Sequence, residues 1–329
     1  SAKGRNPARD SVKIRRKASL LGIPCLTAID TANALADSLM SRYTPENTEI
    51  IDINNLKERK QKLKFTKMSA CSNDYIYINL FDEENKVSSP EFLSIYLSDR
   101  HNGVGGDGVI LICPSDKADA QMRMFNLDGS EGWMCGNGIR CVAKYIFDNG
   151  IAKGQKVGEG RYLLHIDTKS GVKDCTVITK NGLVSKVTVD MGRAELAPEK
   201  IPVRLEGEQV VDKPISIGGN VYRITCCSMG NPHCTVFVPS VDKLDLQDLG
   251  PKFENDPMFP DRVNVSFVEV IDQHTLKARI WERGSGETMA CGTGTCAAVV
   301  AATLNGYCEK GKDIRVILKG GELKIHYTD

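Results

Sequence analysis

The sequence predicts an α+β fold of two related domains, and three observations support this prediction. From Leu63 onward the chain consists mainly of short segments with alternating apolar and polar residues, each bounded by Gly, Asn, Asp or Pro. Only a few segments have the period of an amphipathic helix. Landmarks of the first half recur in the second half. Together these features indicate many strands with one principal helix in each half.

The first segment, residues 1–62, is basic, with 12 Lys and Arg against 7 Asp and Glu. Its pattern predicts a helix from Asp10 to Leu21 ended by Gly22, a strand from Ile23 to Ala28 and a helix from Thr31 to Arg42. Such a short segment cannot bury a core of its own. We therefore expect a small helical appendage that takes no part in catalysis.

The rest of the chain contains the expected strands and three expected helices. Alternation is clear in three strands, Tyr75–Ile78, Leu183–Val189 and Cys234–Val238. Helical period is present in Glu91–Asp99, Asn137–Phe147 and Thr293–Leu304.

The order of landmarks in the first half is repeated in the second. In each half an Arg precedes a Cys by twelve residues and a Glu precedes it by four, and the Cys begins a Cys-Gly-x-Gly motif. The matched pairs are Arg123 with Arg279, Glu131 with Glu287, Cys135 with Cys291, Asn73 with Asn231, and Asp99–Asn102 with Asp261–Asn264. This repeat predicts two related domains, 63–180 and 181–329, with a cleft between them.

Composition excludes several classes of function. The 329 residues are 41% hydrophobic and 26% charged with a net charge of +1, so nothing favours nucleic acid or an anionic membrane as a partner. No apolar run approaches the ~20 residues that span a bilayer. The twelve cysteines include no C-x2-C pair, and no signal peptide precedes them, so zinc and a secreted disulfide framework are both disfavoured. We expect reduced thiols in a cytoplasmic protein.

The two Cys-Gly-x-Gly motifs carry the chemistry that the sequence predicts. Each lies between a strand and a helix, where unpaired helix N–H groups favour a bound carboxylate and a thiolate. Two such thiols across one cleft can remove a proton from one face of a carbon and return one to the other face. Two alternatives remain, that both cysteines are buried turn residues, or that they form a redox disulfide. No P-loop or dinucleotide fingerprint is present, and Gly103–Gly108 suits a tight turn, so no cofactor and no metal are expected.

Four long motifs resemble the diaminopimelate epimerase family, over about four-fifths of the chain. They are F-N-x-D-G-S-E-x-x-x-C-G-N-G-x-R-C (Phe125 to Cys141), M-G-N-P-H (Met229 to His233), R-V-N (Arg262 to Asn264) and W-E-R-G-x-G-E-T-x-A-C-G-T-G (Trp281 to Gly294). The resemblance implies two domains, each a barrel-like sheet around a central helix. It also implies an isomerase that interconverts LL- and meso-diaminopimelate without pyridoxal phosphate or metal, in lysine and peptidoglycan-precursor biosynthesis.

The resemblance also assigns roles to residues of this chain. Cys135 and Cys291 correspond to the two bases, and His233 and Glu282 to residues that orient the site. The N–H and side-chain groups expected to contact the reacting carboxylate belong to Gly136, Asn137, Gly292 and Thr293. The residues expected to hold the rest of the substrate are Asn73, Asn126, Asn231, Asn264, Glu282 and Arg283, the last suited to bidentate carboxylate binding.

Two departures from the family pattern stand out. A loop that usually contains Gly is replaced by Ser69–Ser72, which should alter the loop and keep Asn73 in place. The family also continues beyond the equivalent of Tyr327 with a short T-G-P-A hairpin that completes the first domain. Here the chain ends at Asp329, so we expect an open sheet edge.

The N-terminal segment resembles a different family. Lys3–Arg16 and Gly22–Ala36 are similar to the end of the carbamoyl-phosphate synthetase large subunit, part of a methylglyoxal-synthase-like domain. We interpret about residues 1–52 as a remnant of a fusion or as a cut fragment. A transit peptide is the weaker alternative, since the segment contains acidic residues.

Other functions remain as alternatives. A proline racemase or hydroxyproline epimerase has the same fold and cysteine pair, but the sequence around Asn126 and Trp281–Arg283 favours a diamino-dicarboxylate. A non-catalytic binding module is disfavoured because both cysteines and both glycine motifs are present. A PhzF-like isomerase is disfavoured because that branch lacks the thiol pair. The expected partner is a small-molecule substrate, and a homodimer is kept open.

Overall fold

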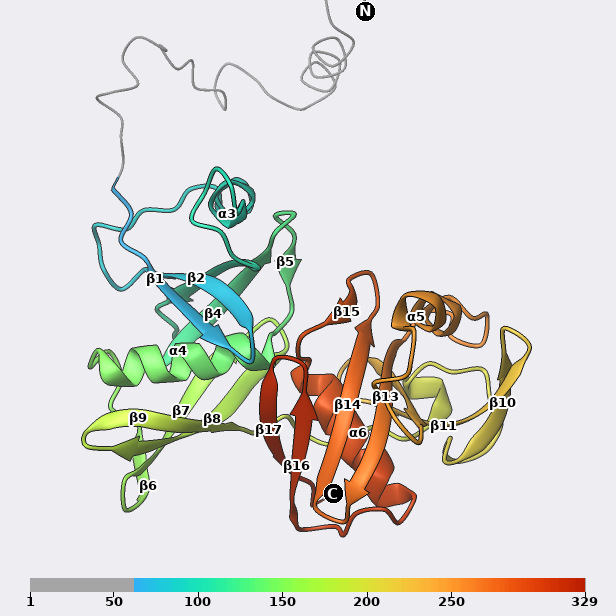
Figure 1. Cartoon of the computed structure of the whole chain (residues 1–329). Helices are drawn as coiled ribbons and strands as arrows, with labels where there is room; N and C mark the ends of the chain where they lie inside the picture. Colours follow the sequence, from blue (N-terminus) through green and yellow to red (C-terminus); the bar gives the residue numbers. More distant parts are fainter. Residues whose placement is uncertain (1–61, 329) are drawn as a thin grey trace, which may run out of the picture. The chain divides into compact units, whose positions relative to one another are not determined.

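The computed structural model describes residues 62–328, and Figure 1 shows the course of the chain. All but the last residue of the expected N-terminal appendage lies outside the described residues. The helices and strand expected there, and the resemblance to the synthetase, therefore stay predictions. The described residues form two lobes, each a sheet with one long helix.

The first lobe contains nine strands and two helices. The strands are β1 (Thr66–Ala70), β2 (Asn73–Asn79), β3 (Gly108–Cys113), β4 (Ala120–Asn126), β5 (Glu131–Gly132), β6 (Gln155–Gly158), β7 (Arg161–Thr168), β8 (Gly171–Lys180) and β9 (Leu183–Val189). The helices are α3 (Pro90–Ser98) and α4 (Gly136–Asp148).

The sheet of the first lobe curls around α4. Its order is β1-β2-β3-β4-β7-β8-β9, with β5 beside β4 and β6 beside β7. The pairs β2–β3 and β4–β7 are parallel, and the others are antiparallel. Because α4 contacts both β1 and β9, which lie at opposite ends of this order, the sheet must wrap around the helix.

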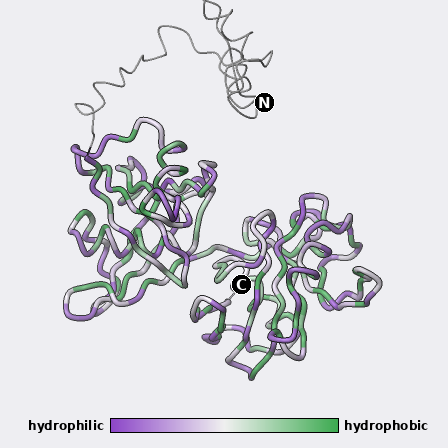
Figure 2. The backbone as a smooth tube through the Cα atoms, turned by 45° about the horizontal axis from the view of Figure 1, so that its top comes forward, coloured by the Kyte–Doolittle hydropathy of each residue, from purple (hydrophilic) through white to green (hydrophobic). Residues whose placement is uncertain are grey.

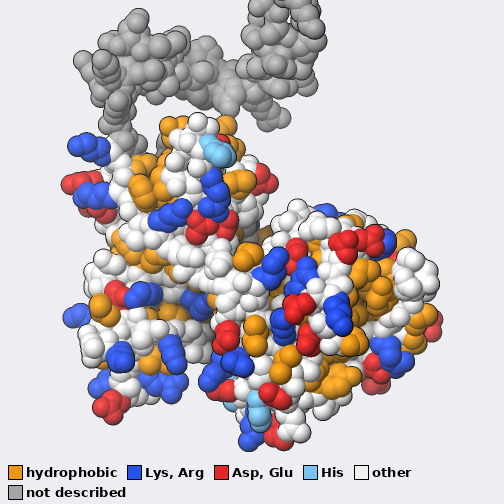
Figure 3. Space-filling model, in the orientation of Figure 1, with side chains coloured by type: hydrophobic (Ala, Val, Ile, Leu, Met, Phe, Trp, Pro, Cys, Tyr) orange, Lys and Arg blue, Asp and Glu red, His pale blue; other side chains and the backbone are white. Residues whose placement is uncertain are grey.

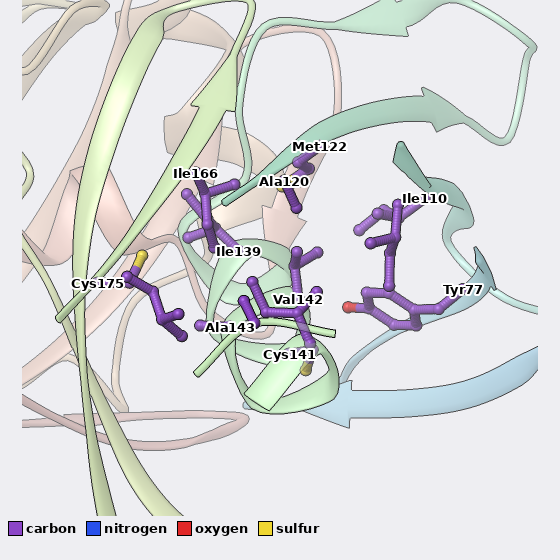
Figure 4. Packing of buried hydrophobic residues seen from close by; sticks show 14 of the residues in the cluster. Tyr77, Ile110, Ala120, Met122, Ile139, Cys141, Val142, Ala143, Ile166 and Cys175 are labelled. Carbon is purple, nitrogen blue, oxygen red and sulfur yellow. The ribbon is translucent and has the colours of Figure 1, made fainter. Parts of the chain in front are cut away.

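Apolar side chains of α4 recur at helical spacing and fill this curled sheet. Ile139, Val142, Ala143 and Ile146 are fully buried. In Figure 4 the first three point toward residues of the surrounding strands, among them Ile110 of β3. Burial of this one stripe of α4 provides the core of the first lobe.

The second lobe repeats the plan with eight strands. They are β10 (Lys213–Ile217), β11 (Asn220–Ser228), β12 (Pro232–Phe237), β13 (Asn264–Asp272), β14 (Thr275–Glu282), β15 (Gly286–Thr288), β16 (Asp313–Leu318) and β17 (Gly321–His326). The helices are α5 (Leu246–Glu254) and α6 (Gly292–Leu304), with a 3-10 turn, η2 (Pro198–Lys200), before the sheet.

The second sheet has the order β10-β11-β12-β13-β14-β16-β17, with β15 beside β14. Helix α6 contacts strands along most of this order, from β11 to β17. Its middle, Ala297–Ala302, is buried on every side, which explains why this helix is apolar all round. The hydropathy-coloured tube in Figure 2 shows apolar stretches distributed through both lobes.

The fold confirms the predicted α+β class with two similar lobes. The three helices expected after Leu63 are present as α3, α4 and α6, and α5 was missed. The expected domain boundary at 180/181 falls inside the hairpin between β8 and β9. Because β9 pairs with β8, the first sheet continues to Val189 and the second begins at Lys213.

The repeat found in the sequence has a physical counterpart in each lobe. Arg123 Nε donates to Glu131 at 2.7 Å across β4 and β5, and Arg279 Nε donates to Glu287 at 2.8 Å across β14 and β15. Each Arg–Glu pair therefore ties a short hairpin to the strand before the helix.

Two further features bear on the sequence expectations. An open edge was expected in the sheet of the first lobe, and the strands at the two ends of that sheet order are β1 and β9. In the described part of the chain, no helix is long and apolar enough to cross a membrane.

On the face drawn in Figure 3, basic and acidic side chains are interspersed.

Candidate active site

Cys135 and Cys291 occupy the same position in the two lobes. Each is the N-cap residue of its lobe's long helix, with φ and ψ of −127° and 115° at Cys135 and −123° and 119° at Cys291. Cys135 Sγ accepts the N–H of Gly138 at 3.3 Å, and Cys291 Sγ accepts that of Gly294 at 3.4 Å. The predicted pair of thiols at helix N-termini is therefore present in the structure.

The two helix N-termini meet at a pair of glycines. A methyl group added at Gly136 would lie 3.6 Å from Gly292 Cα, and one added at Gly292 would lie 3.4 Å from Gly136 Cα. Backbone therefore faces backbone where α4 approaches α6. Two positive helix ends converge there, so the junction favours a bound carboxylate.

Asn137 connects the two lobes through its side chain. Only 2% of the residue is exposed, and its Nδ2 donates to Ala290 O at 3.3 Å in the second lobe. Arg140 donates to Asn137 Oδ1 at 2.6 Å and to Gly136 O at 2.8 Å. The Asn137 side chain is therefore held in this link, and the substrate contacts expected from Asn137 stay a prediction.

Cys135 lies among hydrogen-bonding groups from β2. Its thiol donates to Asn73 Oδ1 at 3.4 Å, and the Tyr75 side chain lowers the pKa of Cys135 against the larger effect of burial. Asn73 is itself fixed, because its Nδ2 donates to Asp107 Oδ2 at 2.6 Å. Arg100 in turn donates to Asp107 at 2.9 Å. A chain of polar contacts therefore orients the amide that faces the first thiol.

The turn that precedes Asn73 departs from the family's Gly-containing loop, as expected. Cys71 and Ser72 have φ of 52° and 63°, a conformation that L side chains seldom adopt. The Ser72 hydroxyl donates to Gly320 O at 3.2 Å in the second lobe. This turn thus provides a second contact between the lobes while it delivers Asn73 to the site.

Cys291 has a different set of neighbours. Its sulfur lies 3.4 Å from Thr293 Oγ1, and the charge of the Glu282 carboxylate raises its pKa. Thr288 Oγ1 donates to Glu282 Oε1 at 2.6 Å, which holds that carboxylate at the end of β14. Burial raises the pKa of Glu282 despite this hydrogen bond.

The direction of the thiol pKa values differs from the expectation for a helix N-terminus. Burial is the largest influence and raises the pKa of both Cys135 and Cys291 above the usual value, while the backbone N–H groups lower them. The Glu282 charge raises the pKa of both thiols further. Loss of water around the sulfur therefore outweighs the helix field.

His233 lies in the buried interior on β12. Its Nε2 is 3.0 Å from Asn231 Oδ1, and its Nδ1 has no hydrogen-bond partner in the part of the chain that the structure describes. Burial lowers the pKa of His233 to about 3, with a further contribution from the Arg283 charge. The imidazole is therefore neutral at physiological pH and orients Asn231.

The other expected substrate residues have hydrogen-bond partners within their own lobes. Asn264 Nδ2 donates to Pro232 O at 2.9 Å, and Asn264 Oδ1 accepts the backbone N–H of Arg283 at 3.1 Å. The Arg283 guanidinium donates to Asp261 O at 2.9 Å. In the first lobe, Asn126 Nδ2 donates to Ser130 Oγ at 2.9 Å.

Sequence analysis missed a buried carboxylate that supports this side of the site. Glu254 of α5 accepts the Trp281 indole N–H at 2.7 Å, the Gly284 N–H at 2.8 Å and Arg262 Nη1 at 3.0 Å. It therefore fixes the residues on both sides of Glu282 and Arg283. The repeat contained a signal for it, because Arg262 matches Arg100, which also binds carboxylates.

The family model and the relatives that are similar in sequence indicate one family. The family model described as "Diaminopimelate epimerase" matches residues 65–197 and 225–329. A diaminopimelate epimerase from Desulfovibrio desulfuricans is 48% identical over 273 residues, which are 81% of this chain and 91% of the relative. One from Agathobacter rectalis is 49% identical over 274 residues, covering 80% of this chain and 92% of the relative.

Solved structures resemble the chain in fold at low sequence identity. A hydroxyproline epimerase from Agrobacterium vitis has a TM-score of 0.57 at 14% identity, covering 82% of this chain and 84% of that one. A probable proline racemase from Agrobacterium radiobacter has a TM-score of 0.56 at 15% identity, covering 80% and 84%.

Proposed function

The chain belongs to the diaminopimelate epimerase family, and we propose that it interconverts LL- and meso-diaminopimelate by moving a proton through two thiols. One observation carries this proposal. Cys135 and Cys291 have the same N-cap geometry on two helices whose N-termini meet at Gly136 and Gly292. The protein is thus an isomerase of amino-acid biosynthesis, in the branch that leads to lysine.

The two thiols supply both proton steps. One thiolate takes the proton from the α-carbon and becomes a thiol, and the electron pair left on carbon delocalises into the carboxylate. The opposite thiol then gives its proton to the other face and becomes a thiolate. One C–H bond breaks and one forms. At the end of the reaction the cysteine that began as a thiolate is a thiol, and the opposite cysteine is a thiolate.

The buried surroundings suit this chemistry. A desolvated thiolate has a raised pKa and is therefore a stronger base toward a weakly acidic C–H bond. The N–H groups at the ends of α4 and α6 stabilise the charge that develops on the substrate carboxylate. No cofactor takes part in the proposed steps.

The remaining family positions are proposed to hold the distal end of the substrate. The Arg283 guanidinium is suited to a bidentate carboxylate contact, and the Glu282 carboxylate to an ammonium group. Amide side chains are proposed to complete the site, from Asn73, Asn126, Asn231 and Asn264. We place the reaction in the cytoplasm, where thiols stay reduced.

Isotope exchange tests the proposal directly. The protein in D₂O should incorporate deuterium at the α-carbon of LL- and meso-diaminopimelate and leave proline unlabelled. Cys135→Ala and Cys291→Ala should each abolish epimerisation while the far-UV circular dichroism stays unchanged. Full turnover by either variant would refute the two-thiol mechanism, and labelling of proline would favour the racemase alternative.

A further inference from the structure

The junction between the two lobes is built from unlike halves. Asn137 of the first lobe reaches across to Ala290 O, whereas its counterpart in the repeat, Thr293, lies 3.4 Å from a sulfur of its own lobe. Arg140, which holds Asn137, has Cys296 as its counterpart, five residues after the matched cysteine. Cys296 is buried, with 7% exposed, so no second guanidinium takes the equivalent place in α6. The link therefore runs in one direction, from donors of the first lobe to a backbone carbonyl of the second.

Arg140 fixes the orientation of the Asn137 amide. Its Nη2 donates to Asn137 Oδ1 at 2.6 Å, and its Nη1 donates to Gly136 O at 2.8 Å. A carboxamide has one acceptor end and one donor end, so an oxygen held by a guanidinium leaves the NH₂ group to face Ala290 O. Without Arg140 the amide could turn its oxygen toward that carbonyl, where two acceptors repel each other. The guanidinium therefore sets which end of Asn137 meets the second lobe.

The same guanidinium also reaches the other contact between the lobes. Arg140 Nη2 donates to Cys71 Sγ at 3.6 Å, and the hydroxyl of the residue after Cys71 donates to Gly320 O at 3.2 Å. The Gly320 N–H in turn donates to Met289 O at 2.8 Å. Both contacts therefore lead from this guanidinium to the two carbonyls that directly precede Cys291.

We propose that Arg140 is a positioning residue for the reaction, which sets the alignment of the Cys135 and Cys291 thiols across the substrate. Cys135 caps the helix that carries Arg140, and the carbonyls held through the junction belong to the segment that delivers Cys291. Removal and return of a proton need thiols on opposite faces of one carbon, and a displacement of about 1 Å costs on the order of 100-fold in rate. This inference rests on the proposed two-thiol function.

A misaligned pair of thiols has a distinct signature in D₂O. One thiolate can still remove the α-proton and become a thiol. When the opposite thiol is out of line, the first thiol exchanges its proton with the solvent and returns deuterium to the face that lost the proton. Label then enters with the configuration retained. The ratio of retained to inverted label therefore reports the alignment of the thiols, whereas loss of folded enzyme lowers both rates equally.

Arg140→Met keeps an unbranched apolar stem and removes the donors. We expect kcat for diaminopimelate to fall by about 10- to 100-fold and the ratio of retained to inverted label to rise by about ten-fold. Arg140→Lys, with a compact ammonium group in place of the planar fork, should recover part of both. Lys144→Met is the matched control, one helical turn further along α4, because Lys144 donates to Asp148 Oδ2 and Val184 O within its own lobe. It should leave the ratio unchanged.

Three results would overturn the role of Arg140. They are wild-type kcat in Arg140→Met, a lowered kcat with an unchanged ratio, and an equal rise of the ratio in Lys144→Met. If Arg140→Met does not fold, Arg140→Lys carries the same test, and a wild-type ratio in that variant would also overturn the proposal. A wild-type enzyme that exchanges no α-proton would instead refute the proposed function.

Discussion

Gly250 of α5 offers a sharp test of how the second lobe is built. Replacing a glycine inside a helix by alanine normally stabilises the protein by about 1 kcal/mol. Here a methyl group at Gly250 would lie 2.1 Å from Trp281 Cδ2 and 2.4 Å from Cε3. These are atoms of a rigid ring held by the hydrogen bond to Glu254. Gly250→Ala should therefore destabilise the protein.

The expected magnitude follows from the displaced contacts. Overpacking of a close-packed core costs about 1–3 kcal/mol. Loss of the indole hydrogen bond to the Glu254 carboxylate costs about 1.5–3 kcal/mol. After the gain in helix propensity, the free energy of unfolding should fall by about 2–5 kcal/mol. Because Trp281 directly precedes Glu282, kcat/KM for diaminopimelate should also fall, by about 10- to 100-fold.

Urea unfolding followed by circular dichroism measures the stability, and α-proton exchange measures the activity. Gly158→Ala is the matched control, because a methyl group there would meet only the Arg161 side chain, at 3.5 Å. It should change stability by less than about 0.5 kcal/mol. A Gly250→Ala protein as stable and as active as the wild type would refute this account of the α5–β14 packing.

Three further perturbations follow from the site. Stability should fall as pH decreases from 6.5 toward the His233 pKa of about 3, since the unfolded chain then binds a proton that the folded chain excludes. This effect should lower the free energy of unfolding by about 1.4 kcal/mol for each pH unit in that range. The His233→Gln variant should lack this pH dependence, and urea unfolding at pH 7 and pH 5 would show it. Glu254→Gln should lower the melting temperature, at a cost of about 1–3 kcal/mol, because one amide oxygen cannot replace two carboxylate oxygens toward Trp281 and its neighbours. Hydrogen peroxide should inactivate the enzyme slowly at neutral pH and faster at higher pH, with recovery in dithiothreitol, because burial raises the pKa of Cys135 and Cys291 and so lowers the fraction of reactive thiolate at neutral pH. An inactivation rate independent of pH would contradict this.

The repeat made much of the fold predictable. Spacing along the chain fixed the correspondence between Cys135 and Cys291, and each became the N-cap of a helix as the strand–Cys-Gly-x-Gly–helix pattern indicated. Helix α5 escaped notice because Gly250 and Pro251 interrupt its helical pattern. Its N-cap, Asp245, accepts the N–H groups of the first turn and was the signal available.

Properties set by tertiary packing could not be predicted. The helix field at Cys135 was foreseeable from local sequence, but the loss of water that outweighs it depends on side chains distant along the chain. The same is true of Asn137, whose link to Ala290 joins positions 153 residues apart.

The contact between Gly136 and Gly292 lies where a two-fold axis relating the lobes would pass. In a symmetric dimer of identical subunits such an axis brings each residue near it against its own copy. Here Gly136 faces Gly292, its counterpart in the repeat, within a single chain. A duplicated half-chain, as the internal repeat indicates, is consistent with this geometry. Once both copies share a chain they can diverge separately, and two residues after the matched Asn73 and Asn231 the first half has Tyr75 and the second half His233. A protein that began with two equal half-sites could thus evolve a distinct role for each.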